Sequence, residues 1–517
     1  METIKKKKDF RDILLSIFYV IFTLSFSYVF INCFFRDISV YKKFNPLIYL
    51  IIGILVCILW YFLYKFIKKL FSKLSKKAIY ILFGLTFVVS IIILILVSIV
   101  FDAPLGWDFD VVYNQAKSYV LTGNRNLLAT YPEYFQLFPN NIFIFTLEVV
   151  FFKIGQFFGI NNFLSVGIFF NGISIFLSIL FLVLYCYRKF GKEKAYFSLL
   201  ISFFFLPLYL YLPIFYSDTL SIAFGPFLLF LSTFIEDNKL KKNILIFIFM
   251  ALALFVGMKI KMTVLFFFVG FIFYFIIVKK YKTCLLFLMI FCVCYLGSNI
   301  IYQKTIVERE SFSFEVNDYG KIPVTHWLMM GIEDPNADNS DRNSYGGYNL
   351  KDYKITQSYK TGKDSVPRHF EEIGKRLKNY GFFCYMDYLT KKTVNAWGDG
   401  SYYAPVALTI NKNVNHDTKV QKFLTSQNND VIFYFEEGVQ VAFLFILCFS
   451  GFYCYKKKDK ETLVEHMSIF LLLLFLLVWE NRSRYLYNYI PIFIIIIVYY
   501  IDKLKLLGGL KWKKYRK

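Results

Sequence analysis

Long apolar runs alternate with short polar segments along nearly the whole chain. A helix that crosses the hydrocarbon core of a bilayer needs about 20 mostly apolar residues. The runs therefore predict an all-α polytopic membrane protein with about twelve transmembrane helices, plus a surface-lying or re-entrant helix at 142–158. The twelve predicted spans lie near residues 12–35, 46–66, 79–101, 163–187, 195–212, 219–235, 243–258, 262–278, 284–301, 438–455, 463–479 and 487–501.

The charged residues between the runs predict the orientation of these helices. If 142–158 does not cross, the polar segments on one side hold 32 Lys and Arg against 8 Asp and Glu. Cytoplasmic loops carry such an excess of basic residues, so both termini are predicted to be cytoplasmic and the site extracytoplasmic, at the cell membrane. Those segments are 1–11, 65–77, 188–194, 236–242, 279–282, 456–461 and 502–517.

Composition agrees with a membrane protein and argues against a nucleic-acid partner. Of the 517 residues, 57% are apolar and 18% are charged, whereas soluble domains are about 45–50% apolar and about 25% charged. The net charge of +23 resides essentially in the segments predicted to be cytoplasmic, beside anionic membrane lipid. Most of the nine cysteines lie in or at the ends of apolar runs, which does not suggest a disulfide framework.

The spans divide the chain into three regions. Residues 1–301 form an N-terminal transmembrane region whose first outer loop, 102–162, is the candidate catalytic loop. Residues 302–430 form a polar extracytoplasmic domain, predicted to be a small α-rich cap, and 431–517 form a C-terminal transmembrane region. Function is therefore expected in the loop and the cap.

The first outer loop begins with several carboxylates. Asp102, Asp108 and Asp110 lie among apolar and aromatic residues, and a partly desolvated carboxylate gains basicity. Asp108 is the first candidate for a general base and Asp110 the second. Helix capping or a solvated loop would also explain these acids.

Polar residues at two further outer positions are candidates for binding a sugar or acceptor. Asn140 and Asn141 follow Pro139 and offer amide groups for hydroxyls, and Tyr134 offers a stacking face. Asp218 faces the same compartment in the short second outer loop. Helix N-capping is the alternative explanation for Asn141 and for Asp218.

Two groups of cations are candidates for binding a phosphate. Lys259 and Lys261 lie in a tight turn between two spans, and Arg482 and Arg484 lie in the last outer turn against the positive-inside trend. The arginine fork suits phosphate oxygens. The alternatives are snorkelling of the lysines and a salt bridge from either arginine to Glu480.

Together these motifs resemble the GT-C superfamily of polytopic glycosyltransferases, in particular the bacterial relatives of protein O-mannosyltransferases and aminoarabinose transferases. The resemblance rests on the acidic loop, the Pro-Asn-Asn helix, Tyr-Ser-Asp-Thr at 216–219, Lys-x-Thr at 261–263, and Glu-x-Arg-x-Arg-Tyr at 480–485 followed by Pro491. It covers most of the chain through short motifs.

The resemblance implies an inverting transfer of a sugar from a polyprenyl-phosphate donor on the outer face. Asp108 best matches the catalytic acid of the family, but the common pattern is Asp followed directly by Glu. Here Phe109 separates Asp108 from Asp110, which leaves the choice of base open. The implied acceptor is a glycan, a teichoic acid or a protein.

Other functions remain open from the sequence. A lipid-linked glycan transporter or flippase, an outer-face polysaccharide polymerase or ligase, and a non-catalytic assembly partner also fit a polytopic chain. No metal site is expected, because the four histidines are scattered. A divalent metal beside Asp108 and Asp110 stays open, and no other cofactor is predicted.

Overall fold

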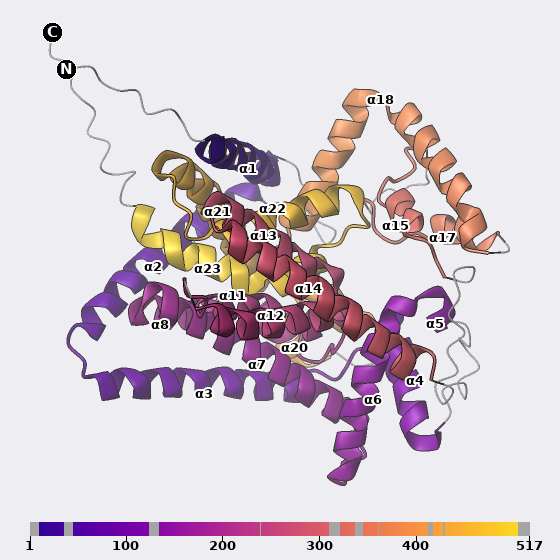
Figure 1. Ribbon diagram of the computed structural model, residues 1–517, viewed down its shortest axis with the longest axis horizontal. Coiled ribbons are helices and arrows are strands. Elements are labelled where there is room, and N and C mark those ends of the chain that lie inside the picture. Colours follow the sequence, from indigo (N-terminus) through magenta and orange to yellow (C-terminus); the bar gives the residue numbers. More distant parts are fainter. Residues whose placement is uncertain are drawn as a thin grey trace.

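The structure is a computed structural model, and it describes helices throughout and no strand in its assigned parts. These parts are residues 10–35, 45–123, 134–237, 239–309, 321–336, 345–359, 361–411, 417–427 and 430–504. The prediction of an all-α fold is confirmed for them. Figure 1 shows the long helices packed into one bundle, with shorter helices gathered at one of its ends.

Eight helical segments in the described residues are long and apolar enough to cross a membrane, judged by length and composition. Three shorter apolar helical segments accompany them. The eight are Phe10–Phe34, Pro46–Phe71, Lys76–Val100, Phe163–Phe190, Leu240–Ile260, Tyr281–Val307, Val431–Lys457 and Ser483–Leu504, and the three are Ser217–Ser232, Met262–Ile277 and Leu463–Val478. They carry the helices α1 (Phe10–Phe35), α2 (Pro46–Phe71), α3 (Lys76–Val100), α7 (Phe163–Phe190), α12 (Leu240–Ile260), α13 (Leu265–Ile277), α14 (Tyr281–Tyr302), α21 (Val431–Lys457), α22 (Leu463–Val478) and α23 (Ile490–Tyr500).

Helix breaks interrupt two of the predicted spans. The stretch 195–212 is divided between α8 (Lys192–Ser202) and α9 (Pro207–Leu210), and 219–235 is divided between α10 (Ser217–Leu220) and α11 (Phe224–Ser232). Pro207 has no N–H to donate and begins α9, a position where helices tolerate proline. Apolar composition alone does not reveal such breaks, because the intervening residues are apolar too.

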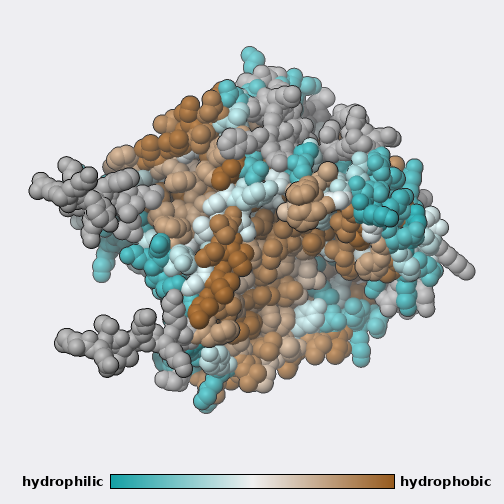
Figure 2. Space-filling view, turned by 90° about the horizontal axis from the view of Figure 1, so that it is seen from above, coloured by the Kyte–Doolittle hydropathy of each residue, from teal (hydrophilic) through white to brown (hydrophobic). Residues whose placement is uncertain are grey.

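Apolar residues cover the middle of the face shown in Figure 2, and hydrophilic residues gather mainly toward its left and right ends. In the interior, α21 packs between α1 and α2. A Cβ on Gly438 would lie 2.3 Å from Cγ2 of Ile52, and one on Gly53 would lie 2.5 Å from Cγ1 of Val441. The two glycines therefore allow α2 and α21 to approach closely, as small residues do in membrane helices.

The predicted surface helix is α6 (Ile142–Phe157), which packs against α4 (Trp107–Thr122) and α7. Its 16 residues are fewer than the number that a span requires. Figure 1 shows α4, α5 (Tyr134–Leu137) and α6 together at the end of the bundle.

The described part of the polar region 302–430 beyond residue 320 forms what we call the capping domain. Its helices are α15 (Val324–Met330), α17 (Leu350–Gln357), α18 (Val366–Trp397), α19 (Ala404–Thr409) and α20 (Lys419–Leu424). In Figure 1, α15 and α17 lie beside the first arm of the bent α18. The prediction that this region is rich in α-helix is borne out by these elements.

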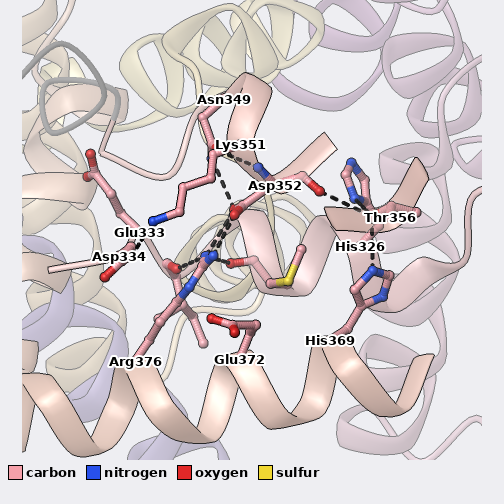
Figure 3. Close-up of polar contacts among 12 residues, drawn as sticks. His326, Glu333, Asp334, Asn349, Lys351, Asp352, Thr356, His369, Glu372 and Arg376 are labelled. Carbon is pink, nitrogen blue, oxygen red and sulfur yellow. Dashed lines mark hydrogen bonds and ion pairs between the residues drawn. The ribbon is translucent and has the colours of Figure 1, made fainter. Parts of the chain in front are cut away.

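A buried polar network holds α15, α17 and α18 together (Figure 3). Arg376 pairs with both carboxylate oxygens of Asp352, at 2.5 and 2.9 Å, and donates to the carbonyls of Met329 and Ile332. The Thr356 hydroxyl lies 2.6 Å from Nδ1 of His326 and 2.9 Å from Nε2 of His369. Two histidines that are distant in the sequence therefore meet around one threonine. His466 instead contacts Ser450 in the bundle, and His416 lies outside the described residues.

Candidate functional site

The candidate site lies where several short elements meet at the end of the bundle beside the capping domain. α4 contributes Asp108, α5 contributes Tyr134, and α10 contributes Asp218. The 3₁₀ turn η2 (Pro139–Asn141) contributes two amides, and η7 (Ser483–Tyr489) contributes an arginine. Lys261 directly precedes a further 3₁₀ turn, η3 (Met262–Val264).

A chain of hydrogen bonds ends on Asp108. The Tyr134 hydroxyl donates to Oδ1 of Asp108 at 2.7 Å and accepts from Nδ2 of Asn141 at 2.6 Å. Oδ1 of Asn141 accepts from the Tyr216 hydroxyl at 3.1 Å. Asn141 makes no side-chain capping bond at the start of α6, so the capping alternative for this residue was wrong. Asn140 in turn donates to Asn141 at 3.2 Å.

This chain changes the expected roles of Tyr134 and Asn141. Both were candidates for contacting a sugar, yet both are buried and their polar groups bond to one another. Burial, with Tyr216 and Asp108 nearby, raises the pKa of Tyr134 well above its usual value. Tyr134 therefore stays a neutral hydrogen-bond donor toward Asp108.

Asp110 lies one residue beyond the buried Phe109 and has a separate environment. Its Oδ1 accepts a hydrogen bond from Asn114 at 2.7 Å. Burial raises the pKa of Asp110, and the bond from Asn114 opposes that shift. The two candidate bases thus differ in their partners, tyrosine for Asp108 and asparagine for Asp110.

A second cluster centres on Asp218, which forms an ion pair with Lys261 and lies 4.0 Å from Nε of Arg484. The backbone N–H of Tyr216, at the start of α10, donates to the Thr219 hydroxyl at 3.1 Å. Asp218 therefore does not act as the helix cap, and that alternative was wrong. One carboxylate is shared by two cations.

The two cations of this cluster also face aromatic rings. Nζ of Lys261 lies 4.6 Å from the centre of the Tyr485 ring. Cζ of Arg484 lies 5.3 Å from the Trp107 ring and 5.4 Å from the Tyr485 ring. The Lys261 side chain is 11% exposed, so it does not snorkel into solvent. Burial lowers the pKa of Lys261, and Asp218 opposes that shift.

Trp107 has an unusual backbone for a tryptophan, with φ of 52° at the start of α4. A bulky residue in this left-handed region is strained, and such strain is often found at functional sites. The conformation accompanies a close approach of the indole to Arg484. The Trp107 side chain thus connects the segment that carries Asp108 with the cluster of Lys261 and Arg484.

The structure separates Lys259 and Arg482 from this cluster. Lys259 donates to Asn299 of α14 at 2.8 Å and lies 4.4 Å from the Tyr302 ring. Arg482 faces the Tyr403 ring at 5.6 Å, and Gly347 packs against its guanidinium. Arg482 therefore contacts the capping domain.

A half-buried aspartate that was not among the predicted site residues fixes the turn that carries the arginines. Asp399 accepts from the Ser483 hydroxyl at 2.5 Å and from the backbone N–H of Tyr403 at 3.0 Å. Its other oxygen accepts from Ser401. The Gly-Asp-Gly turn at 398–400 was the signal that could have identified it. Trp107 and Tyr216 were not candidates either, although Tyr216 begins the Tyr-Ser-Asp-Thr motif and Trp107 precedes Asp108.

A small, largely apolar pocket opens beside the cation cluster. It contains about 290 Å³ of empty space, part of which is open solvent. Asp218 and Arg484 are its charged lining residues, and the Asp108 neighbours Trp107 and Phe109 line it as well. The lining is completed by Tyr211, Ile214, Tyr216, Thr219 and Ala407.

The arrangement can perform two chemical tasks. An oriented carboxylate can accept a proton from a hydroxyl, and a lysine with an arginine can bind an anion such as a phosphate. No group of three or more His, Cys, Asp or Glu suited to a metal ion occurs among the described residues.

Comparison with protein families assigns the chain as a whole. Residues 6–505 match the model of a family described as a conserved hypothetical integral membrane protein. The chain belongs to this family. No curated protein and no solved structure matches it. Family membership and the long apolar helices identify a multi-pass membrane protein.

Proposed function

We propose that the protein is a GT-C-type, inverting glycosyltransferase that moves a sugar from a polyprenyl-phosphate donor to an acceptor outside the cytoplasm. The observation that carries the proposal is the approach of Trp107, the residue before Asp108, to Arg484, which shares Asp218 with Lys261. These residues are far apart in sequence and were expected together from chemistry.

In the proposed reaction Asp108 accepts the proton of the acceptor hydroxyl. The acceptor oxygen then attacks the anomeric carbon from the face opposite the phosphate. The bond from this carbon to the phosphate oxygen breaks, and the phosphate leaves with the electron pair. Such a reaction needs one base and a cationic environment for the leaving group.

Lys261 and Arg484 provide this environment, with Asp218 as their partner when no donor is bound. A donor phosphate competes with the Asp218 carboxylate for the same two cations. Because Asp218 balances part of their charge, both can stay charged in a buried place. The side chains that line the pocket are mostly apolar.

The chain needs no nucleotide-binding loop if its donor is a lipid. Membrane lipid and a glycan, teichoic acid or protein acceptor remain the proposed partners. The proposed orientation, with cytoplasmic termini and an outer site, comes from the basic clusters between the spans.

The test is transfer by the purified chain in lipid nanodiscs, using a panel of radiolabelled polyprenyl-phosphate sugars and a cell-envelope extract as acceptor. We expect Asp108→Asn to lower kcat by about 10²- to 10⁴-fold, the size of a lost general base. Asp110→Asn is the matched control and should retain more activity. Equal thermal stability of the variants would show that the fold is kept. Full activity in both variants would reject a carboxylate base in this loop.

A transporter of lipid-linked glycans is the second candidate, because broken helices interrupt the bundle. The side chain of Asn171 on α7 donates to the carbonyls of Tyr211, Leu212 and Ile214, at 2.8 to 3.2 Å. Transporters often place such unwound segments at their binding sites. Movement of a fluorescent polyprenyl-phosphate sugar across proteoliposomes, without transfer of its sugar, would favour this function over the transferase.

A further inference from the structure

The bend of α18 exposes two aromatic side chains on the capping domain. The helix changes direction at Gly381, whose φ of 61° lies in the left-handed region that glycine adopts without strain. Phe382 and Phe383 follow directly and are 73% and 84% exposed. In Figure 1 the bend stands at the top of the view, away from the other helices of the capping domain.

The arm of α18 beyond the bend packs against a candidate membrane span. The Tyr28 hydroxyl of α1 lies 2.6 Å from the Thr390 hydroxyl of α18. The rings of Phe26 and Trp397 meet with their centres 5.2 Å apart. Because Thr390 and Trp397 meet nearly the same level of α1, this arm crosses α1 instead of running along it.

The crossing takes place beside the outward face of α1. Leu24 and Ile31, one turn to either side of Tyr28, are 66% and 50% exposed. In a multi-pass membrane protein, an exposed apolar face on a span is the face that lipid covers. The arm therefore passes α1 at a level where its neighbours are acyl chains or headgroups.

The helix geometry of α18 gives the position of the bend relative to α1. Phe383 precedes Thr390 by seven residues, and a helix rises about 1.5 Å per residue. The two phenylalanines thus lie about 10 Å from the contact with Tyr28, beyond the side of α1. A pair of phenylalanines in water would be unfavourable, whereas the membrane interface accepts aromatic rings.

We infer that Phe382 and Phe383 insert into the membrane leaflet on the capping-domain side and anchor this domain to the lipid surface. Lys375 and Lys378, on the other arm, are exposed. Their ammonium groups suit the headgroups while the rings occupy the acyl region. The occupant of this surface is lipid, and the inference does not depend on glycosyl transfer.

Cys384, exposed next to the two rings, supplies a native position for a test. A nitroxide label on Cys384, in the full chain in phospholipid nanodiscs with Cys292→Ser, reports its access to lipid-soluble oxygen and to a water-soluble nickel complex. The same chain with Cys384→Ser gives the background. A label on Ser358→Cys in that background, at the exposed end of α17, is the matched aqueous control.

We expect at least fivefold lower access to nickel at Cys384 than at Ser358→Cys, with higher access to oxygen. In the double variant Phe382→Ser, Phe383→Ser, access to nickel at Cys384 should rise toward that of the control. Equal nickel access at both positions in the unmodified domain would overturn the inference. A double variant that keeps its low nickel access would also overturn it, because the rings would not be the anchor.

Discussion

At the scale of single residues, the hydrogen bonds of a side chain show whether it positions the candidate base or is itself available to a substrate. The polar atoms of Tyr134 and Asn141 form hydrogen bonds with each other, with Tyr216 and with Asp108. A residue that orients a base acts through the base, so we regard both as positioning residues. The remaining capacity of the Asp108 carboxylate is what a substrate hydroxyl would use.

Two lysines separated by one residue give a matched pair for testing the phosphate site. Lys261 faces Asp218, whereas Lys259 faces Asn299 of α14. We expect Lys261→Met to raise the KM for the donor by 10-fold or more, because a charge-assisted contact contributes about 1.5–3 kcal/mol. Lys259→Met should change KM less than about twofold. Steady-state transfer at varied donor concentration measures both.

Lys261→Arg serves as the rescue variant in the same experiment, since it keeps the positive charge beside Asp218. Partial recovery of KM by this variant would separate loss of charge from loss of packing. Equal effects of the Lys259 and Lys261 methionine variants would contradict the separation of the two lysines.

At the scale of helices, the close approach of α2 and α21 depends on small side chains. We expect Gly438→Ala to destabilise the protein by about 1–3 kcal/mol, the usual cost of overpacking, because the new methyl group meets Ile52. Gly84→Ala in α3 is the matched control, since a Cβ there meets nothing within 4 Å. Thermal unfolding in detergent should show a lower Tm for Gly438→Ala alone. A Tm equal to that of the control would contradict the close contact.

The histidine network predicts how the capping domain responds to acid. Burial lowers the pKa of His326 to about 4, with His369 adding to the shift, whereas an unfolded histidine titrates near 6.5. The unfolded state binds more protons between these values, so stability is full above about pH 6.5 and falls as the pH drops toward 4. The loss from this group is on the order of 3 kcal/mol.

Limited proteolysis of the capping domain at pH 7 and pH 4.5 would measure this effect. We expect faster cleavage at pH 4.5, and a smaller difference between the two pH values in His326→Gln, which cannot titrate. Acid sensitivity that is unchanged in this variant would point to other groups.

The sequence predicts the long helices better than it predicts helix breaks or the contacts at the candidate site. Long apolar runs predict α1, α2 and α3 well, because a helix in the hydrocarbon core of a bilayer needs about 20 mostly apolar residues. The break between α9 and α10 escapes prediction, because the Asn171 amide that bonds to its carbonyls is 40 residues or more away in the sequence. At the site, charge chemistry identifies Asp108, Lys261 and Arg484. The roles of Asn141 and Asp399 depend on contacts across the fold, and a single sequence does not contain them.

At the scale of the whole molecule, the proposed function requires the candidate site and the capping domain to lie outside the cytoplasm. Ser72, exposed at the end of α2, and Ser358, exposed at the end of α17, give a matched pair of serine-to-cysteine variants for opposite sides. The background chain carries Cys292→Ser and Cys384→Ser, which remove its exposed cysteines among the described residues.

We expect a membrane-impermeant maleimide to label Ser358→Cys in intact cells and to label Ser72→Cys only after permeabilisation. The reason is the basic cluster at 65–77, which favours the cytoplasmic side. Labelling of both positions in intact cells, while a cytoplasmic thiol protein of the same cells stays unlabelled, would contradict their placement on opposite sides. Labelling of Ser72→Cys alone would place Asp108 in the cytoplasm and reject a donor used on the outer face, whatever the chemistry of the cluster.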